Sequence, residues 1–306
     1  MVRSFLVAAV RFRWAIIAAW ATAAVLARCS SRRRQHSMIT AAWHLDQDPG
    51  TTDRKPALEP APIRQSRNRV TAVADSSTRL DTVGVADVVL IHSTGQGAAG
   101  WKRVVDALGR RGIKGHPVEL PDDQSMTAAD FACLVREQTG PASAPVVLAH
   151  SGSGPLLPGT ARLLGAAHQV WLAAWVPAAG RSFTEDVRAN LTEAFDAAWV
   201  GKDPIADDAV AREFLYHDCD EATLQWALAT RRSFYPAAVY QEALSLAPEV
   251  PSTYIVATGD RTIRPAWQRR MARERLGVEP AELVSGHCPN VSQPERLADL
   301  ILACGR

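Results

Sequence analysis

The sequence predicts an α/β fold with a mostly parallel sheet and helices on both of its faces. From residue 86 onward, short apolar runs alternate with stretches whose apolar residues recur at helical spacing. The runs at 87–92 and 144–150 are apolar through their centres and rich in valine, which is typical of strands buried on both faces. Because a helix between two strands carries the chain back to its starting edge, this alternation produces parallel strands.

The individual elements follow from these two patterns. The first helix, 100–112, has apolar residues at 101, 104, 105 and 108, and Gly112 ends it. The second helix, 126–140, begins with a residue suited to capping, Thr127. A long helical region at 181–247 interrupts the alternation. Further helices are expected at 152–165, 265–277 and 293–303, and strands at 87–92, 116–121, 144–150, 168–175, 252–258 and 281–285.

Charge divides the chain near residue 84. Residues 1–84 hold 13 Lys and Arg against 6 Asp and Glu, whereas residues 85–306 hold 21 against 26. The whole chain is near neutral, with 34 basic and 32 acidic side chains, which gives no case for a nucleic-acid binder. Residues 29–84 are rich in proline and charge without an apolar period, so we expect a flexible linker there and a folded domain at 85–306.

The first 28 residues form a hydrophobic leader flanked by arginine. Its uncharged stretch, 14–27, has 14 residues, fewer than the roughly 20 that a membrane-spanning helix needs, and fits the central region of a signal peptide. Three roles stay open for residues 1–28: a signal peptide or membrane anchor, an arginine-rich transit leader, and an over-extended gene start. We expect the domain at 85–306 in the cytoplasm, with anchoring or export through residues 1–28 as alternatives and membrane contact only through them.

Polar residues that follow the strands carry the chemistry, because ligands bind beyond the carboxyl ends of parallel strands. Ser151 follows the run 144–150 and opens a helix, with small residues two positions before and after it, Ala149 and Ser153. A tight turn from strand to helix of this kind exposes the central serine as a nucleophile. A helix-capping serine is the alternative.

A serine hydroxyl needs a base to take its proton, and the base needs a carboxylate to orient it. Of the eight histidines, only His287 follows the last predicted strand. Asp260 follows the preceding strand, 252–258, in the string TGDR, where a turn aspartate is the alternative. The order serine, acid, histidine makes Ser151, Asp260 and His287 a candidate catalytic triad.

Two backbone N–H groups are the candidate oxyanion hole. One belongs to Gly152, directly after the serine, and the other to Thr94, in the loop 92–97 after the first strand. The glycines of this loop do not form a phosphate-binding pattern, since neither G-x-x-x-x-G-K-[ST] nor G-x-G-x-x-G occurs there.

Four strings carry a family resemblance: VVLIHSTGQGAAGW, VVLAHSGSG, YIVATGDRTIRPAWQRRMA and SGHCPNVSQPERLADLI. In this order they resemble the α/β-hydrolase superfamily, and within it the small esterase and hydroxynitrile-lyase branch. The resemblance implies the α/β-hydrolase fold for residues 85–306, with a helical cap at about 181–247. It also implies a serine carboxylesterase that acts on a small-molecule ester with no cofactor and no metal, as a monomer or homodimer.

The chain departs from the family at positions that bear on the reaction. Ser93 stands where the family's esterases usually have glycine, and the lyases of the branch carry a hydroxyl residue there. Those lyases also carry lysine directly after the catalytic histidine, whereas this chain has Cys288. We therefore rank a hydroxynitrile lyase, a carbon–carbon lyase on the same triad, below an ester hydrolase. A non-catalytic ligand receptor is the third hypothesis, which the intact triad disfavours.

Aromatic residues gather in the region 181–247 and at the end of the strand 168–175. Aromatic side chains at helical spacing are first of all core residues, and a cap over an apolar pocket is the functional alternative. That alternative implies a small apolar or aromatic ester. The candidate pocket residues are Ser93, Trp175, Trp199 and Trp226.

Overall fold

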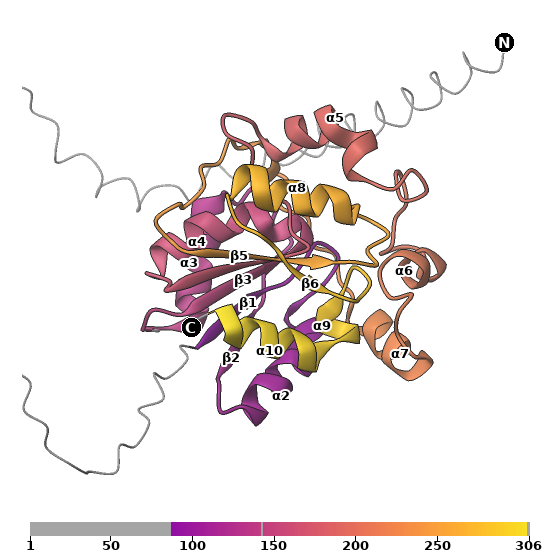
Figure 1. The fold of residues 1–306 in the computed structure, drawn as a ribbon, viewed down its shortest axis with the longest axis horizontal. Helices are drawn as coiled ribbons and strands as arrows, with labels where there is room; N and C mark the ends of the chain where they lie inside the picture. Colours follow the sequence, from indigo (N-terminus) through magenta and orange to yellow (C-terminus); the bar gives the residue numbers. More distant parts are fainter. Residues whose placement is uncertain (1–86, 142, 305–306) are drawn as a thin grey trace, which may run out of the picture. The chain divides into compact units, whose positions relative to one another are not determined.

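Six parallel strands form one sheet in the part of the chain that the structure, a computed structural model, describes, residues 87–141 and 143–304 (Figure 1). The strand order is β2-β1-β3-β4-β5-β6, and every neighbouring pair is parallel. The predicted leader, 1–28, and linker, 29–84, lie outside the described residues. The strands are β1 (Val88–Ile91), β2 (Gly115–Val118), β3 (Val146–His150), β4 (His168–Leu172), β5 (Ser252–Ala257) and β6 (Ala281–Leu283).

Helices cover both faces of this sheet, which confirms the predicted α/β class (Figure 1). Side chains that alternate along each strand belong to different cores. Val89 and Ile91 of β1 pack in a cluster with α3, α4 and α8, whereas Val88 and Leu90 pack in a second cluster with α2 and α10. The helices are α2 (Lys102–Arg110), α3 (Ala128–Thr139), α4 (Leu157–Leu163), α8 (Pro265–Arg275), α9 (Pro289–Ser292) and α10 (Pro294–Cys304).

Several predicted bounds were too long at the carboxyl ends of the strands. The strand predicted at 116–121 ends at Val118, because the N–H of Leu120 donates to His92 instead of a strand neighbour. The strand predicted at 168–175 ends at Leu172, although the residues after it stay buried. Thr127 caps α3 as predicted, and its side chain and that of Asp130 bind each other's backbone N–H in a capping box.

The helix predicted at 152–165 begins differently. Its first part is a 3-10 helix, η2 (Ser151–Leu156), and only its second part is the α-helix α4. Two prolines explain the change, because Pro155 and Pro158 lack the N–H that a continuous α-helix would use.

The region between β4 and β5 is helical only in part. It contains η3 (Val239–Gln241) and the helices α5 (Phe183–Ala194), α6 (Asp208–Phe214) and α7 (Glu221–Thr230). Each of the three α-helices starts at a side-chain cap, provided by Ser182, Asp207 and Asp220. No helix within residues 87–141 and 143–304 is long and apolar enough to cross a membrane.

Candidate active site

Ser151 occupies a strained turn between β3 and η2. Its φ is +56°, in the left-handed region that non-glycine residues rarely adopt. The carbonyl of Ser151 accepts a hydrogen bond of 3.0 Å from the N–H of Trp175, which holds the turn against the end of β4. A Cβ atom at Gly154 would lie 2.0 Å from the carbonyl oxygen of Trp175, so this position requires glycine. The turn therefore has the geometry predicted for a nucleophile elbow.

The small residues predicted around the turn lie where the chain packs most closely. Ala149 is buried in the core, and the hydroxyl of Ser153 donates a hydrogen bond of 2.5 Å to the carbonyl of His92. The hydroxyl of Ser153 thus ties the elbow to the loop after β1. Gly154, which approaches the backbone even more closely, was not singled out from the sequence.

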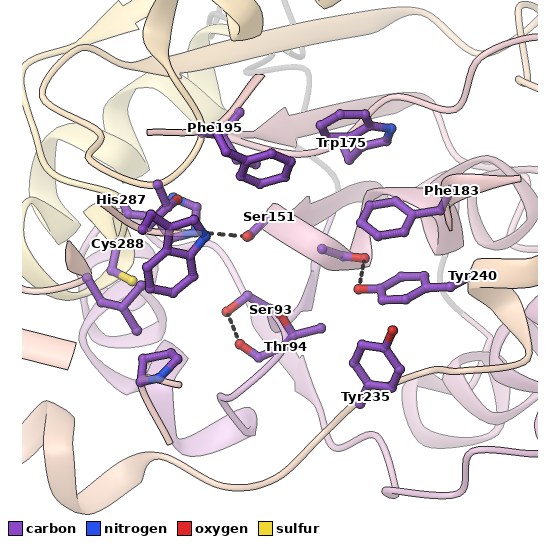
Figure 2. Close-up of a pocket in the computed structure, with 16 residues that line it drawn as sticks. Ser93, Thr94, Ser151, Trp175, Phe183, Phe195, Tyr235, Tyr240, His287 and Cys288 are labelled. Carbon is purple, nitrogen blue, oxygen red and sulfur yellow. Dashed lines mark hydrogen bonds between the residues drawn. The ribbon is translucent and has the colours of Figure 1, made fainter. Parts of the chain in front are cut away.

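The structure brings Ser151, His287 and Asp260 together in one line of hydrogen bonds. His287 Nε2 lies 2.8 Å from Ser151 Oγ, and His287 Nδ1 lies 2.7 Å from Asp260 Oδ2 (Figure 2 shows the first contact). All three residues are buried, although 136 positions separate the serine from the histidine in the chain. This geometry suits proton transfer from the serine hydroxyl to the imidazole.

Asp260 is held by donors on both carboxylate oxygens. Oδ1 accepts from the N–H and hydroxyl of Thr262 at 2.7 and 2.9 Å and from the N–H of Ile263 at 3.2 Å. Oδ2 accepts from the amide of Gln268 at 2.8 Å, beside its contact with His287. With donors on both oxygens, the buried carboxylate is fully hydrogen-bonded and fixed in direction. Sequence reasoning missed Thr262 and Gln268; the Asp-x-Thr spacing, an Asx-type turn, was the available signal for the first.

Gly152 and Thr94 both line the pocket beside Ser151. Gly152 is the second residue of η2, so its N–H has no acceptor within that helix. Its carbonyl accepts a hydrogen bond of 2.8 Å from the hydroxyl of Tyr240 (Figure 2). A Cβ at Gly152 would lie 2.5 Å from that hydroxyl and 3.1 Å from the Thr94 side chain. The site accordingly admits no side chain at 152, and Tyr240, one of the aromatic residues of the region 181–247, supports it through this hydrogen bond.

Two further histidines adjoin the site in neutral form. His92 accepts the N–H of Leu120 on Nε2 and contacts the carbonyl of Ser93 through Nδ1, so Nδ1 carries its single proton. Burial is the main reason that the pKa of His92 falls to about 4. His150 donates through Nε2 to the carbonyl of His287 at 2.8 Å. Burial, and then the neighbouring charge of His287, lower the pKa of His150 to about 3.

The pocket at Ser151 has a volume of about 200 Å³ and two differently built sides (Figure 2). Four aromatic residues lie on the side away from His287: Trp175, Phe183, Tyr235 and Tyr240. The rings of Phe183 and Tyr240 stack at 4.0 Å between centroids, and Trp175 meets Phe183 edge to face at 5.5 Å. We call this set the aromatic side.

The side next to His287 combines a thiol with apolar side chains. It is formed by Cys288, Leu215 and Trp199, which belong to one apolar cluster. Cys288 accepts a hydrogen bond of 3.4 Å from the Gln96 amide, and burial raises the pKa of its thiol well above the usual value. We call the set of Cys288, Leu215 and Trp199 the histidine side.

The predicted pocket residues are brought together with one exception. Ser93, Trp175 and Trp199 line the pocket, and the Ser93 hydroxyl donates to the carbonyl of Thr94 at 3.2 Å. Trp226 does not line this cavity. Its ring lies 5.8 Å from the guanidinium of Arg103, because its position on α7 turns it toward the cluster beneath the helix.

Known proteins share this sequence pattern and this fold. Residues 88–300 match the alpha/beta hydrolase family. No curated protein sequence matches the chain. Among solved structures, polyneuridine aldehyde esterase is 18% identical with a TM-score of 0.64, and the match covers 73% of this chain and 100% of the other. A pyrethroid hydrolase from Sphingobium faniae is 22% identical with a TM-score of 0.58, covering 72% and 98%.

A third solved structure is an extracellular alpha/beta-hydrolase from a Paenibacillus species, described as sharing structural and functional homology with tobacco salicylic acid binding protein 2. It is 18% identical with a TM-score of 0.54, and the match covers 72% of this chain and 99% of the other. These identities establish a common fold. The match over residues 88–300 takes in every strand of the sheet and confirms the resemblance drawn from the four strings: the chain belongs to the alpha/beta hydrolase family.

Proposed function

We propose that this protein is a serine carboxylesterase with Ser151 as nucleophile, His287 as general base and acid, and Asp260 as the carboxylate that orients the base. The observation that carries the proposal is the line of hydrogen bonds from Ser151 Oγ to His287 and on to Asp260, at 2.8 and 2.7 Å. Ser151 and His287 line a pocket of about 200 Å³, a size that suits a small substrate.

The steps follow from the hydrogen-bond directions. With its Nδ1 proton donated to Asp260, His287 has a free electron pair on Nε2 that takes the proton of Ser151. Oγ then forms a bond to the ester carbonyl carbon, and the carbonyl oxygen becomes an oxyanion between the N–H groups of Gly152 and Thr94. The alcohol leaves with the proton from His287 Nε2. Water, deprotonated by the same nitrogen, releases the acid and restores Ser151.

The two sides of the pocket assign the two halves of the ester. The departing alcohol must lie next to Nε2 of His287 to receive its proton, so it occupies the histidine side. The oxyanion points toward Thr94 and Gly152, which leaves the aromatic side for the acyl group. Stacked rings such as Phe183 and Tyr240 favour a flat or apolar acyl group. The preferred substrate is therefore a small alcohol ester of an aromatic or apolar acid.

The region 181–247 acts in this scheme as a cap over the pocket. It contributes residues to both sides, including Phe183 and Tyr240 on the aromatic side and Leu215 on the histidine side. A cap of this kind excludes bulk water from the carbonyl and strengthens the hydrogen bonds around it.

Hydrolysis fits the pocket better than cyanide release. A lyase of this type needs a cation to stabilise departing cyanide, and no Lys or Arg lies among the described residues that line the cavity. Arg264 is close in the chain to residues that line the pocket, but its guanidinium donates a hydrogen bond of 2.9 Å to the carbonyl of Phe195. The thiol of Cys288 is neutral because burial raises its pKa.

Paired esters test the proposal and its substrate. Methyl phenylacetate carries its ring on the acid and benzyl acetate carries it on the alcohol, so we expect the first to be cleaved with the higher kcat/KM. Phe183→Ala should lower kcat/KM for methyl phenylacetate about tenfold, a barrier change of about 1.4 kcal/mol, and should change the value for methyl acetate much less. The matched control, Leu215→Ala, alters the histidine side and should leave this preference for the aryl acid in place. Equal or reversed preference would contradict the assignment of the two sides, and absence of ester cleavage by the folded wild type would contradict the function.

A further inference from the structure

The turn between α6 and α7 touches both loops that carry the acid and the base. His217 Nε2 lies 3.0 Å from the carbonyl oxygen of Gly259, the residue directly before Asp260. The next residue, Asp218, accepts a hydrogen bond of 2.6 Å on Oδ2 from the N–H of Gly286, the residue directly before His287. His217 and Asp218 are consecutive in the chain, and they thus bind the backbone directly before the proposed acid and directly before the proposed base.

Glycine at both contact positions allows this close approach. A Cβ at Gly286 would lie 2.6 Å from Asp218 Oδ1 and 3.0 Å from His217 Nε2. A Cβ at Gly259 would lie 3.0 Å from the carbonyl oxygen of Ser285, which itself accepts the N–H of Gly259 at 2.8 Å. The two loops are therefore joined to each other, and His217 and Asp218 close over the junction.

We propose that His217 and Asp218 are positioning residues for the triad, which set the direction of His287 relative to Ser151 by fixing the backbone of its loop. The proposal rests on the function proposed above, since it concerns the same base. His287 and Asp260 come from different loops, so their relative placement depends on whatever holds the two loops together. A hydrogen bond to a charged carboxylate is about twice as strong as one between neutral groups, and a misplacement of about 1 Å can cost on the order of 100-fold in rate.

Substitutions at Asp218 separate positioning from general stability. Asp218→Ala removes the acceptor for the Gly286 N–H, and we expect kcat to fall about 10- to 100-fold with KM changed less than about threefold. Asp218→Asn keeps an oxygen acceptor in the same place without the charge, so it should recover kcat to within about threefold of the wild type. His217→Phe, which keeps a ring but loses the donor to Gly259, should lower kcat in the same manner and to a smaller extent.

Asp220 provides the matched control. Its carboxylate lies two positions further on and accepts the N–H of Thr223 at 2.7 Å as the cap of α7. Asp220→Ala should therefore lower the thermal unfolding temperature, because α7 loses its cap, and should leave kcat near the wild-type value.

The experiment measures kcat and KM for p-nitrophenyl acetate, the rate of fluorophosphonate labelling, and thermal unfolding for the full chain and these variants. The proposal predicts that labelling and kcat fall together in Asp218→Ala, recover in Asp218→Asn and stay unchanged in Asp220→Ala. Wild-type kcat in a folded Asp218→Ala would overturn it; if that variant does not fold, wild-type kcat in His217→Phe would do so. Failure of the wild type to react with either reagent would instead refute the esterase itself, so the two failures are distinguishable.

Discussion

Acid should destabilise this domain through two histidines that stay neutral when folded, His92 and His150. In the unfolded chain each has the ordinary histidine pKa of about 6.5, whereas the folded values are about 4 and about 3. The folded pKa is the lower one, so the unfolded state binds more protons between these values. The free energy of unfolding therefore falls as the pH drops below about 6.5, and this loss ends only below the folded pKa.

The hydrogen bonds explain why neither ring takes up a second proton in the folded protein, and the unfolded pKa then determines how much stability is lost. Nε2 of His92 is occupied by the Leu120 N–H, and Nδ1 of His150 is buried without a partner among the described residues, so neither ring has a favourable place for a second proton. Each histidine then costs about 1.4 kcal/mol per pH unit below its unfolded pKa, or about 2 kcal/mol between pH 7 and pH 5. Together they remove about 4 kcal/mol, a large part of the roughly 5–15 kcal/mol that stabilises an ordinary domain.

Urea unfolding at pH 7 and pH 5 measures this loss, and His150→Gln isolates one part of it. Glutamine keeps an N–H donor for the carbonyl of His287 but does not titrate. We expect the variant to lose about 2 kcal/mol less than the wild type between the two pH values, whatever other groups contribute to both proteins. Equal losses in the variant and the wild type would mean that His150 is protonated in the folded state, which would refute the reasoning from burial and hydrogen bonding.

Three further predictions concern turnover of p-nitrophenyl acetate. Tyr240→Phe removes the hydrogen bond to the Gly152 carbonyl and should lower kcat about three- to tenfold at unchanged folding; a wild-type rate would show that this bond does not support the oxyanion site. Gln268→Leu takes one donor from the buried carboxylate of Asp260 and should lower both kcat and the unfolding temperature, as followed by steady-state kinetics and calorimetry. Ser93→Gly should stay within about tenfold of the wild type, about 1.4 kcal/mol or less, and neither protein should release cyanide from mandelonitrile above background; cyanide release that requires Ser93 would favour the lyase.

The sequence predicts the centre of the sheet well because the inner strands β1 and β3 are buried on both faces. A run such as VVLI in β1 has no polar residue to place in solvent, so it fits only the centre of a parallel sheet. The residues directly after the strands were also predictable, because a parallel sheet gathers them at one edge. This explains why Ser151, Asp260 and His287 were selected from the chain and lie together in the structure.

Contacts between distant segments left no comparable local signal. Gln268 lies in the first turns of α8, and only the folding of that helix against β5 brings its amide to Asp260. His217 carries no signal in the sequence, because its partner, Gly259, lies 42 positions away and is recognised only once the loops have approached each other. Trp226 was selected for its aromatic character, but the direction of a side chain on a short helix depends on how that helix packs.

The most direct test is to find which atom carries the acyl group during turnover. After brief mixing with p-nitrophenyl acetate and acid quenching, peptide mass spectrometry should find one acetyl group per chain on Ser151. The variant Ser151→Ala should have a kcat lower by roughly 10⁴-fold or more and no acetylated peptide. Acetylation of Cys288 or Ser93, which line the same pocket, in place of Ser151, or near-normal turnover by a folded Ser151→Ala, would contradict the assignment of Ser151 as the nucleophile.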